Sequence, residues 1–308
     1  MRRIWVVIPG TAIAVLLSGW GSSNQSAQRV DCSNPSASFG KPSVAGDHRE
    51  VLVHFTCAGA KQAGTIYLPL GKGRHPAIIW VHGAGEATRL SYGPLVAAFV
   101  KRGIAFFSYD KRGVGESEGD CCPGDQGDFE LLTADAVGAV ESTRSFAGID
   151  PAQVGFTGAS QAGWIAPQAA VDSRHVAFIA LASPGILRYS VVHEYERFAG
   201  GEGSGKPRPS EEEIAKKLAS VKRSGYDPAP ALRKLKAPAL WLFGGADRNV
   251  PPRQSAAALR LMKTKLHKNW TIIVYPGAGH GLFDSKPTDP RAVPTAATWV
   301  RRHVTLAH

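Results

Sequence analysis

One serine lies where the chain could make it a nucleophile. The run from Val154 to Gly163 reads VGFTGASQAG, an apolar stretch that ends at a glycine and leads through Ser160 into a helix-like segment. A serine on a sharp strand-to-helix turn projects its hydroxyl above the sheet, and small residues must occupy the positions two before and two after it. Gly158 and Ala162 meet that requirement. A helix N-cap serine would give a similar pattern, so the assignment needs partners for Ser160.

Two other residues supply the partners that a serine nucleophile needs. A hydroxyl requires a base, and the base requires a carboxylate that orients it and stabilises its charged form. His280 lies in a loop of glycines and alanine after the last apolar run, and Asp247 directly follows another apolar run. The order Ser160, Asp247, His280 matches one of the known chain orders of such triads. We therefore predict a catalytic triad; the alternatives are an exposed loop histidine and an ordinary turn aspartate.

The backbone offers two donors for the negative charge that acyl transfer creates. The turn His82-Gly83-Ala84-Gly85 follows an apolar run, and Gln161 is the residue after the predicted nucleophile. We predict that the N–H groups of Ala84 and Gln161 form the oxyanion hole. His82 is expected to brace this turn rather than to act as a base.

The elements that would position these residues alternate along the chain. Helix-like spacing covers 94–101, 131–146, 160–171 and 253–266. An opening hairpin followed by alternating strands and helices predicts an α/β fold with a mostly parallel eight-stranded sheet, covered by helices on both faces. The predicted strands are Val51–Thr56, Gly64–Leu68, Ala77–Val81, Ala105–Tyr109, Val154–Thr157, Phe178–Ala182, Ala239–Phe243 and Thr271–Tyr275.

Residues 185–236 interrupt this alternation. They are charged and rich in glycine and proline, with one predicted helix over Ser210–Ser224. An insertion of this length between core strands is usually functional. We interpret it as a small cap over the active site, within a catalytic domain of residues 49–308. Tyr189, Tyr195 and Phe198 are its expected apolar contacts with a substrate.

The N-terminus has the pattern of a secretory signal peptide. Arg2 and Arg3 precede an apolar stretch, and small and polar residues follow, which predicts a leader over about 1–21 and a flexible arm over 22–48. A buried N-terminal helix is the alternative. The run LSGW resembles the lipobox of bacterial lipoproteins, but Trp20 replaces the cysteine that would be lipidated. We expect export to the periplasm, envelope or medium, with membrane contact only through an uncleaved leader.

The four cysteines fit an oxidising compartment. We expect Cys32 and Cys57 to form a disulfide that ties the arm to the first strands. Cys121 and Cys122 are adjacent, and either a vicinal disulfide or two free thiols is compatible with that spacing. No paired C-x-x-C is present, so we expect no metal site.

The chain is basic, with a formal net charge of +11. Part of the excess lies within 202–236 and part within 260–268. Such charge attracts anionic substrates or surfaces, although a solvated face explains it equally well. Aromatic residues do not interleave with the basic ones, so we expect no nucleic-acid partner.

Four motifs together resemble the α/β-hydrolase superfamily. They are the runs QAGTIYLP (62–69), HGAG (82–85) and YDKRGVGES (109–117), and the Ser160 turn. The sequence is most similar to the bacterial branch related to dienelactone hydrolases and to the catalytic domain of prolyl oligopeptidases, over about residues 50–308. The resemblance implies hydrolysis of esters, thioesters or sometimes amides through an acyl-enzyme, without a metal or cofactor. Ala162 and the Cys121-Cys122 insertion depart from the family pattern.

The resulting prediction is a serine hydrolase that cleaves small-molecule carboxylic esters. A peptidase, amidase or thioesterase with the same triad is the alternative. Fewer than 50 residues precede the catalytic body, too few for the propeller domain of prolyl oligopeptidases, which favours esters. A dehalogenase would carry aspartate where Ser160 stands. A non-catalytic binding protein would typically have lost a triad member, and here all three are present.

Overall fold

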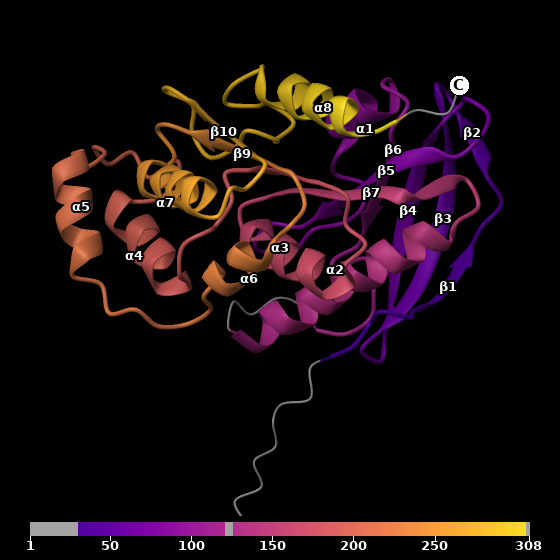
Figure 1. Ribbon diagram of the computed structural model, residues 1–308, viewed down its shortest axis with the longest axis horizontal. Helices are drawn as coiled ribbons and strands as arrows, with labels where there is room; N and C mark the ends of the chain where they lie inside the picture. Colours follow the sequence, from indigo (N-terminus) through magenta and orange to yellow (C-terminus); the bar gives the residue numbers. More distant parts are fainter. Residues whose placement is uncertain (1–29, 121–125, 306–308) are drawn as a thin grey trace, which may run out of the picture.

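A mixed sheet forms the centre of the computed structural model, which describes residues 30–120 and 126–305 (Figure 1). Within those residues the sheet has ten strands. They are β1 (Ser36–Phe39), β2 (Ser43–Ala45), β3 (His48–Cys57), β4 (Ala60–Pro69), β5 (His75–Val81), β6 (Ala105–Tyr109), β7 (Ile149–Ala159), β8 (Ile179–Ala182), β9 (Ala239–Gly244) and β10 (Trp270–Tyr275).

The strand order is β1-β3-β4-β6-β5-β7-β8-β9-β10, with β2 paired to β3. Pairing is parallel from β6 through β10 and antiparallel among β1–β4 and between β4 and β6. This arrangement confirms the predicted α/β-hydrolase fold and all eight predicted strands. Strands β1 and β2 are additional, in the segment expected to be a flexible arm. At four and three residues, with only SASF in β1 alternating between exposed and half-buried positions, they are too short for their sequences to predict strands, and pairing with β3 specifies them instead.

Helices cover both faces of the sheet (Figure 1). Helices α1 (Gly93–Val100) and α8 (Ala292–His303) pack on one face, whereas α2 (Gln126–Ser145), α3 (Ala162–Ser173), α6 (Ala229–Lys234) and α7 (Pro252–Lys265) pack on the other. Strands β5, β6 and β9 are buried at every position because both of their faces are covered. The carboxyl ends of the parallel strands meet at one sheet edge, where ligands bind in open α/β sheets.

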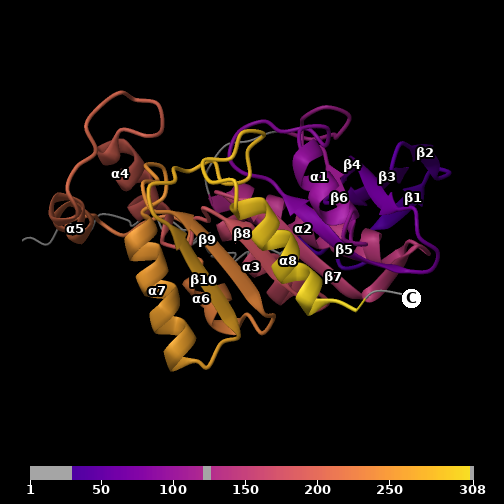
Figure 2. The same ribbon diagram turned by 90° about the horizontal axis from the view of Figure 1, so that it is seen from above.

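The segment expected to form a cap divides into two parts. Helices α4 (Tyr189–Ala199) and α5 (Glu211–Ala219) pack against each other at one end of the molecule, beyond the sheet (Figure 2). Helix α6 instead belongs to the body, because its Leu232 lies in the main core. Ser210 begins α5 with a reciprocal capping box to Glu213. The helix ends at Ala219, five residues before the predicted end.

A disulfide joins Cys32 to Cys57, with the two Cα atoms 5.4 Å apart. It fixes the chain before β1 to the end of β3. The predicted leader, Trp20 and the Cys121-Cys122 pair lie outside the described residues. In residues 30–120 and 126–305, no helix combines the length and the apolarity needed to cross a membrane.

Candidate active site

Ser160 lies at the turn between β7 and α3, in a backbone conformation that residues other than glycine rarely adopt. Its φ is +55°, in the left-handed region that costs a non-glycine residue free energy. Hydrogen bonds hold the turn: Ser160 N donates to Ala182 O of β8 at 3.1 Å, and Gly185 N donates to Ser160 O at 2.9 Å. The surrounding structure thus specifies the strained conformation, as a nucleophile elbow requires.

The residue two before Ser160, Gly158, and the residue two after it, Ala162, fit together in a tight space. A Cβ atom on Gly158 would lie 2.3 Å from Val81 O and 2.7 Å from Ala162 Cβ, so no other residue fits there without a shift of backbone. Ala162 is fully buried and occupies the space that Gly158 leaves open. Alanine is therefore accommodated at the second flank because glycine stands at the first.

Asp247 and His280 form the pair that the sequence predicts. His280 Nδ1 lies 2.9 Å from Asp247 Oδ2, and Asp247 is fully buried. The other carboxylate oxygen of Asp247 accepts hydrogen bonds from Asn249 N at 2.8 Å and Val250 N at 2.9 Å. These donors fix the carboxylate and leave Oδ2 for the imidazole. Asp227, a carboxylate near the end of residues 185–236, forms an ion pair with Arg188.

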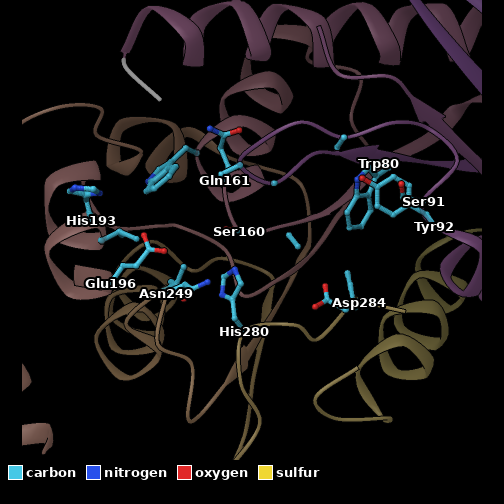
Figure 3. A pocket seen from close by; sticks show the side chains of 18 of the residues that line it. Trp80, Ser91, Tyr92, Ser160, Gln161, His193, Glu196, Asn249, His280 and Asp284 are labelled. Carbon is cyan, nitrogen blue, oxygen red and sulfur yellow. The ribbon is translucent and has the colours of Figure 1, made fainter. Parts of the chain in front are cut away.

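Ser160 and His280 line one cavity of about 700 Å³. Figure 3 shows the His280 ring beside the Ser160 side chain, at the centre of the cavity. No hydrogen bond joins the two side chains among the described contacts. In unliganded active sites such bonds are often long and tighten only when substrate binds. The placement is compatible with proton transfer between the hydroxyl and the imidazole.

Acidic groups around His280 favour its charged form. Burial by itself lowers the pKa of His280, but the hydrogen bond and charge of Asp247 outweigh it, and the charges of Glu202 and Asp284 add to the effect. The pKa is therefore raised above the ordinary value of 6.5. Glu202, from the loop after α4, also accepts a hydrogen bond from His280 N at 2.9 Å. The loop after α4 thus helps to hold the histidine loop.

This arrangement predicts a pH dependence. If His280 is the general base, only the neutral imidazole is active, so kcat/KM falls as the pH drops through its raised pKa. Asp284→Asn removes one of the charges that raise this pKa, and we expect the acidic limb of the kcat/KM profile to move to lower pH. Ser285→Ala, which changes a neutral residue of the same cavity, is the matched control and should leave the limb in place. If the acidic limb of Asp284→Asn lies at the same pH as in the wild type, or at a higher pH, this electrostatic account is contradicted.

Ala84 and Gln161, the predicted oxyanion donors, both line the cavity. Among the described residues neither backbone N–H donates to a protein acceptor, so both are available to a ligand. His82 lies beneath this turn, where its Nε2 is 2.5 Å from Tyr109 O and its Nδ1 is 3.1 Å from the Tyr92 hydroxyl. Burial lowers the pKa of His82 to about 4, so the ring is neutral. These contacts brace the turn.

Helix α4 contributes one of the three aromatic contacts expected from the sequence. Tyr189 lines the cavity, whereas Tyr195 and Phe198 do not. Tyr195 is fully buried, packs with Ile214 of α5 and donates from its hydroxyl to Asp247 O at 2.5 Å. It therefore supports the aspartate loop rather than a substrate. Phe198 is one of the exposed large apolar residues.

The face of α4 that meets the cavity explains why Tyr195 and Phe198 do not line it. The residues of α4 that line the cavity are Tyr189, Val192, His193 and Glu196. Their spacing of i, i+3, i+4 and i+7 defines one face of a helix, and Tyr195 lies on another. This face was detectable from the sequence once α4 was placed. Trp80 and Tyr92 form an aromatic wall on the opposite side of the cavity, whereas His193, Glu196 and Asn249 lie across from it (Figure 3). Phe283 lies next to Trp80, with ring centroids 6.4 Å apart.

The site holds no ligand set for a metal. Within residues 30–120 and 126–305, no three His, Cys, Asp or Glu side chains gather as metal ligands would.

Solved structures show where this fold recurs. Acetyl xylan esterase 1 from a Thermoanaerobacterium species is similar with a TM-score of 0.64 and 20% identity, over 88% of this chain and 89% of that one. An esterase from the archaeon Pyrobaculum calidifontis has a TM-score of 0.59 and 19% identity, over 83% of this chain and 86% of that one. Carboxyl esterase 2 from the fungus Tuber melanosporum has a TM-score of 0.58 and 18% identity, over 85% of this chain and 89% of that one. At these identities the likeness establishes the fold.

Sequence similarity adds the family. The model of the prolyl oligopeptidase family matches residues 94–306, which is more than half of the chain and includes Ser160, Asp247 and His280. The protein is therefore a serine hydrolase of the α/β-hydrolase fold. Within that class, the chain belongs to the prolyl oligopeptidase family.

One curated relative is similar over part of its length. Thiohydrolase aneE from Aspergillus aculeatus is 33% identical over 129 residues, which cover 42% of this chain. The matched part spans 39% of that protein.

Proposed function

We propose that this protein hydrolyses carboxylic esters through an acyl-enzyme, with Ser160 as nucleophile, His280 as base and Asp247 as the residue that orients it. The observation that carries the proposal is the pair of His280 and the buried Asp247, with His280 Nδ1 and Asp247 Oδ2 2.9 Å apart, beside a serine held at φ +55°. A hydroxyl becomes an effective nucleophile only when a base takes its proton.

The first half of the reaction forms the acyl-enzyme. Ser160 Oγ attacks the acyl carbon while its proton moves to His280 Nε2, and the carbonyl oxygen becomes an oxyanion. The N–H groups of Ala84 and Gln161 stabilise that charge. The C–O bond to the alcohol then breaks, and the leaving oxygen receives the proton from His280. Asp247 stabilises the imidazolium throughout.

The second half releases the acid. Water attacks the acyl carbon and gives a proton to His280 Nε2. The Ser160 ester bond then breaks, and Oγ takes the proton back. The same oxyanion donors serve both halves.

The cavity supports a small ester rather than an extended peptide. Its volume of about 700 Å³ falls within the usual range for small-molecule sites, roughly 300–1,000 Å³. Helix α4 covers one side, and Trp80 and Tyr92, with ring centroids 4.4 Å apart, form an apolar wall on the other. The names of the similar solved structures, which are esterases, point the same way. Thioester hydrolysis is a second candidate, favoured by the curated thiohydrolase relative.

A substrate profile tests this proposal. The purified protein is assayed with p-nitrophenyl esters of increasing chain length, with matched thioesters, and with aminoacyl anilides. We expect kcat/KM for the best ester to exceed that for any anilide by at least about 100-fold, because the cavity holds a compact acyl group. Faster anilide cleavage would identify a peptidase or amidase instead. Thioesters that exceed oxygen esters by a similar factor would favour the second candidate.

A further inference from the structure

A buried lysine reaches the loop that carries one of the proposed oxyanion donors. Lys111 follows β6 and is 1% exposed. Its Nζ donates to Gly83 O at 2.9 Å, to Gly85 O at 3.0 Å and to Gln161 Oε1 at 3.0 Å. An ammonium group carries three N–H donors, so these acceptors match its capacity. Taking such a charge out of water is expensive, and the cost needs compensation by well-placed acceptors.

The acceptors of Lys111 flank both proposed oxyanion donors. The carbonyl of Gly83 and the N–H of Ala84 belong to one peptide unit, and in a planar trans peptide these groups point in opposite directions. Because Lys111 holds the carbonyl on the buried side, the Ala84 N–H is directed to the other side, where Gly83 and Ala84 line the cavity. Lys111 also holds the side chain of Gln161, whose own N–H is the second donor.

We propose that Lys111 is a positioning residue that orients and polarises the Gly83–Ala84 peptide for oxyanion binding. The proposal rests on the ester hydrolysis proposed above. A cation hydrogen-bonded to a peptide oxygen draws electron density from the amide, so the N–H of that unit becomes a stronger donor. This effect of the Lys111 cation is largest when the bound oxygen carries a full negative charge, as it does in the tetrahedral intermediates.

Neighbouring contacts hold the same loop in place. Lys111 N donates to Ala87 O at 3.0 Å, and Arg89 N donates to Asp110 Oδ1 at 2.7 Å. The Arg89 side chain also forms a buried ion pair with Asp110. These contacts fix the far end of the loop independently of Nζ. Loss of the Lys111 charge should therefore weaken the donor at Ala84 more than it disorders the loop.

The test is the kinetics of Lys111→Met, measured with the best p-nitrophenyl ester. We expect kcat to fall on the order of 10- to 100-fold, less than the loss from removing an oxyanion donor outright, while KM stays within about twofold. KM is unchanged because acylation and deacylation both pass through an oxyanion. An alkyl boronic acid, which forms a tetrahedral adduct with the nucleophile, should bind more weakly by the same factor as kcat falls.

Two further variants keep the test decisive. Lys111→Gln retains N–H donors for the loop without the charge, so it should fold even where methionine does not, and kcat should still fall at least about fivefold. Arg112→Met removes the neighbouring buried cation, which pairs with Asp135 and contacts the carbonyl of Cys57. This control should lower the melting temperature while kcat of the folded protein stays within about twofold.

The outcomes separate this inference from the proposed function. A wild-type protein that hydrolyses none of the esters overturns the proposed function and this inference with it. Active wild-type protein with unchanged kcat in the folded Lys111 variants overturns the role of Lys111 alone. A rise in KM at constant kcat also overturns it, because that result indicates ground-state substrate binding. A parallel loss of kcat and boronate affinity, at constant KM, supports it.

Discussion

Ser160→Ala should lower kcat of ester hydrolysis by about 10⁴- to 10⁶-fold, as removal of a serine nucleophile does in other triads. The substitution removes only the hydroxyl oxygen, and alanine meets the same backbone constraint at φ +55°. The melting temperature should therefore change by less than about 2 °C, because no buried contact is lost. Initial rates on the best p-nitrophenyl ester and thermal unfolding measure the two effects.

A second serine of the same cavity provides the matched control. Ser91 lines the cavity across from the cap, away from His280 (Figure 3). Ser91→Ala should leave kcat within about threefold of the wild-type value, because surface hydroxyls of this kind contribute little. Comparable losses in the two variants, or activity above about a tenth of wild type in Ser160→Ala, would remove Ser160 from the role of nucleophile.

Asp247→Asn should be less damaging than loss of Ser160 or of His280, with kcat reduced by about 10³- to 10⁴-fold. An asparagine oxygen still accepts from Asn249 N and Val250 N, so the loop should keep its shape. The amide nitrogen would then face His280 Nδ1 and donate to it. That hydrogen bond favours the His280 tautomer with its proton on Nε2. In this tautomer Nε2 has no free lone pair and is unable to accept the proton of Ser160.

Asp227→Asn is the control for loss of a carboxylate near the cap. Asp227 forms an ion pair with Arg188, and both side chains are about one-third exposed. Partly exposed pairs of this kind contribute little, so kcat should stay within about twofold. The double variant Ser160→Ala/Asp247→Asn should be no slower than Ser160→Ala, because the triad acts as one unit. Additive losses would show that Asp247 acts independently of Ser160.

The parts of the site that sequence predicted were those encoded in short segments. The turn at Ser160 follows from an apolar strand, a glycine and a small second flank, and the positions of Asp247 and His280 follow from loops directly after apolar strands. Each of these signals spans fewer than about ten residues, and chain order then relates them. The central strands, such as β5, β6 and β9, were visible for a similar reason, since strands buried on both faces form continuous apolar runs.

The remaining features depend on contacts between distant segments. Strands β1 and β2 form because β3 offers an edge to pair with, and runs of four and three residues are too short to predict a strand from their own sequence. Tyr195 was expected in the cavity, but the phase of α4 directs it to Asp247. Lys111 meets Gly83 only because β5 and β6 are neighbours in the sheet. No spacing in the sequence predicts that reach.

Covalent labelling tests the central claim most directly. The folded, purified protein is treated with a fluorophosphonate, digested, and analysed by peptide mass spectrometry. We predict a single phosphonyl adduct on the peptide that contains Ser160, no adduct in Ser160→Ala, and slower labelling in Asp247→Asn, because only a hydroxyl activated by the His280–Asp247 pair reacts. An adduct on another serine, or an unlabelled Ser160 in protein that hydrolyses esters, would contradict the account.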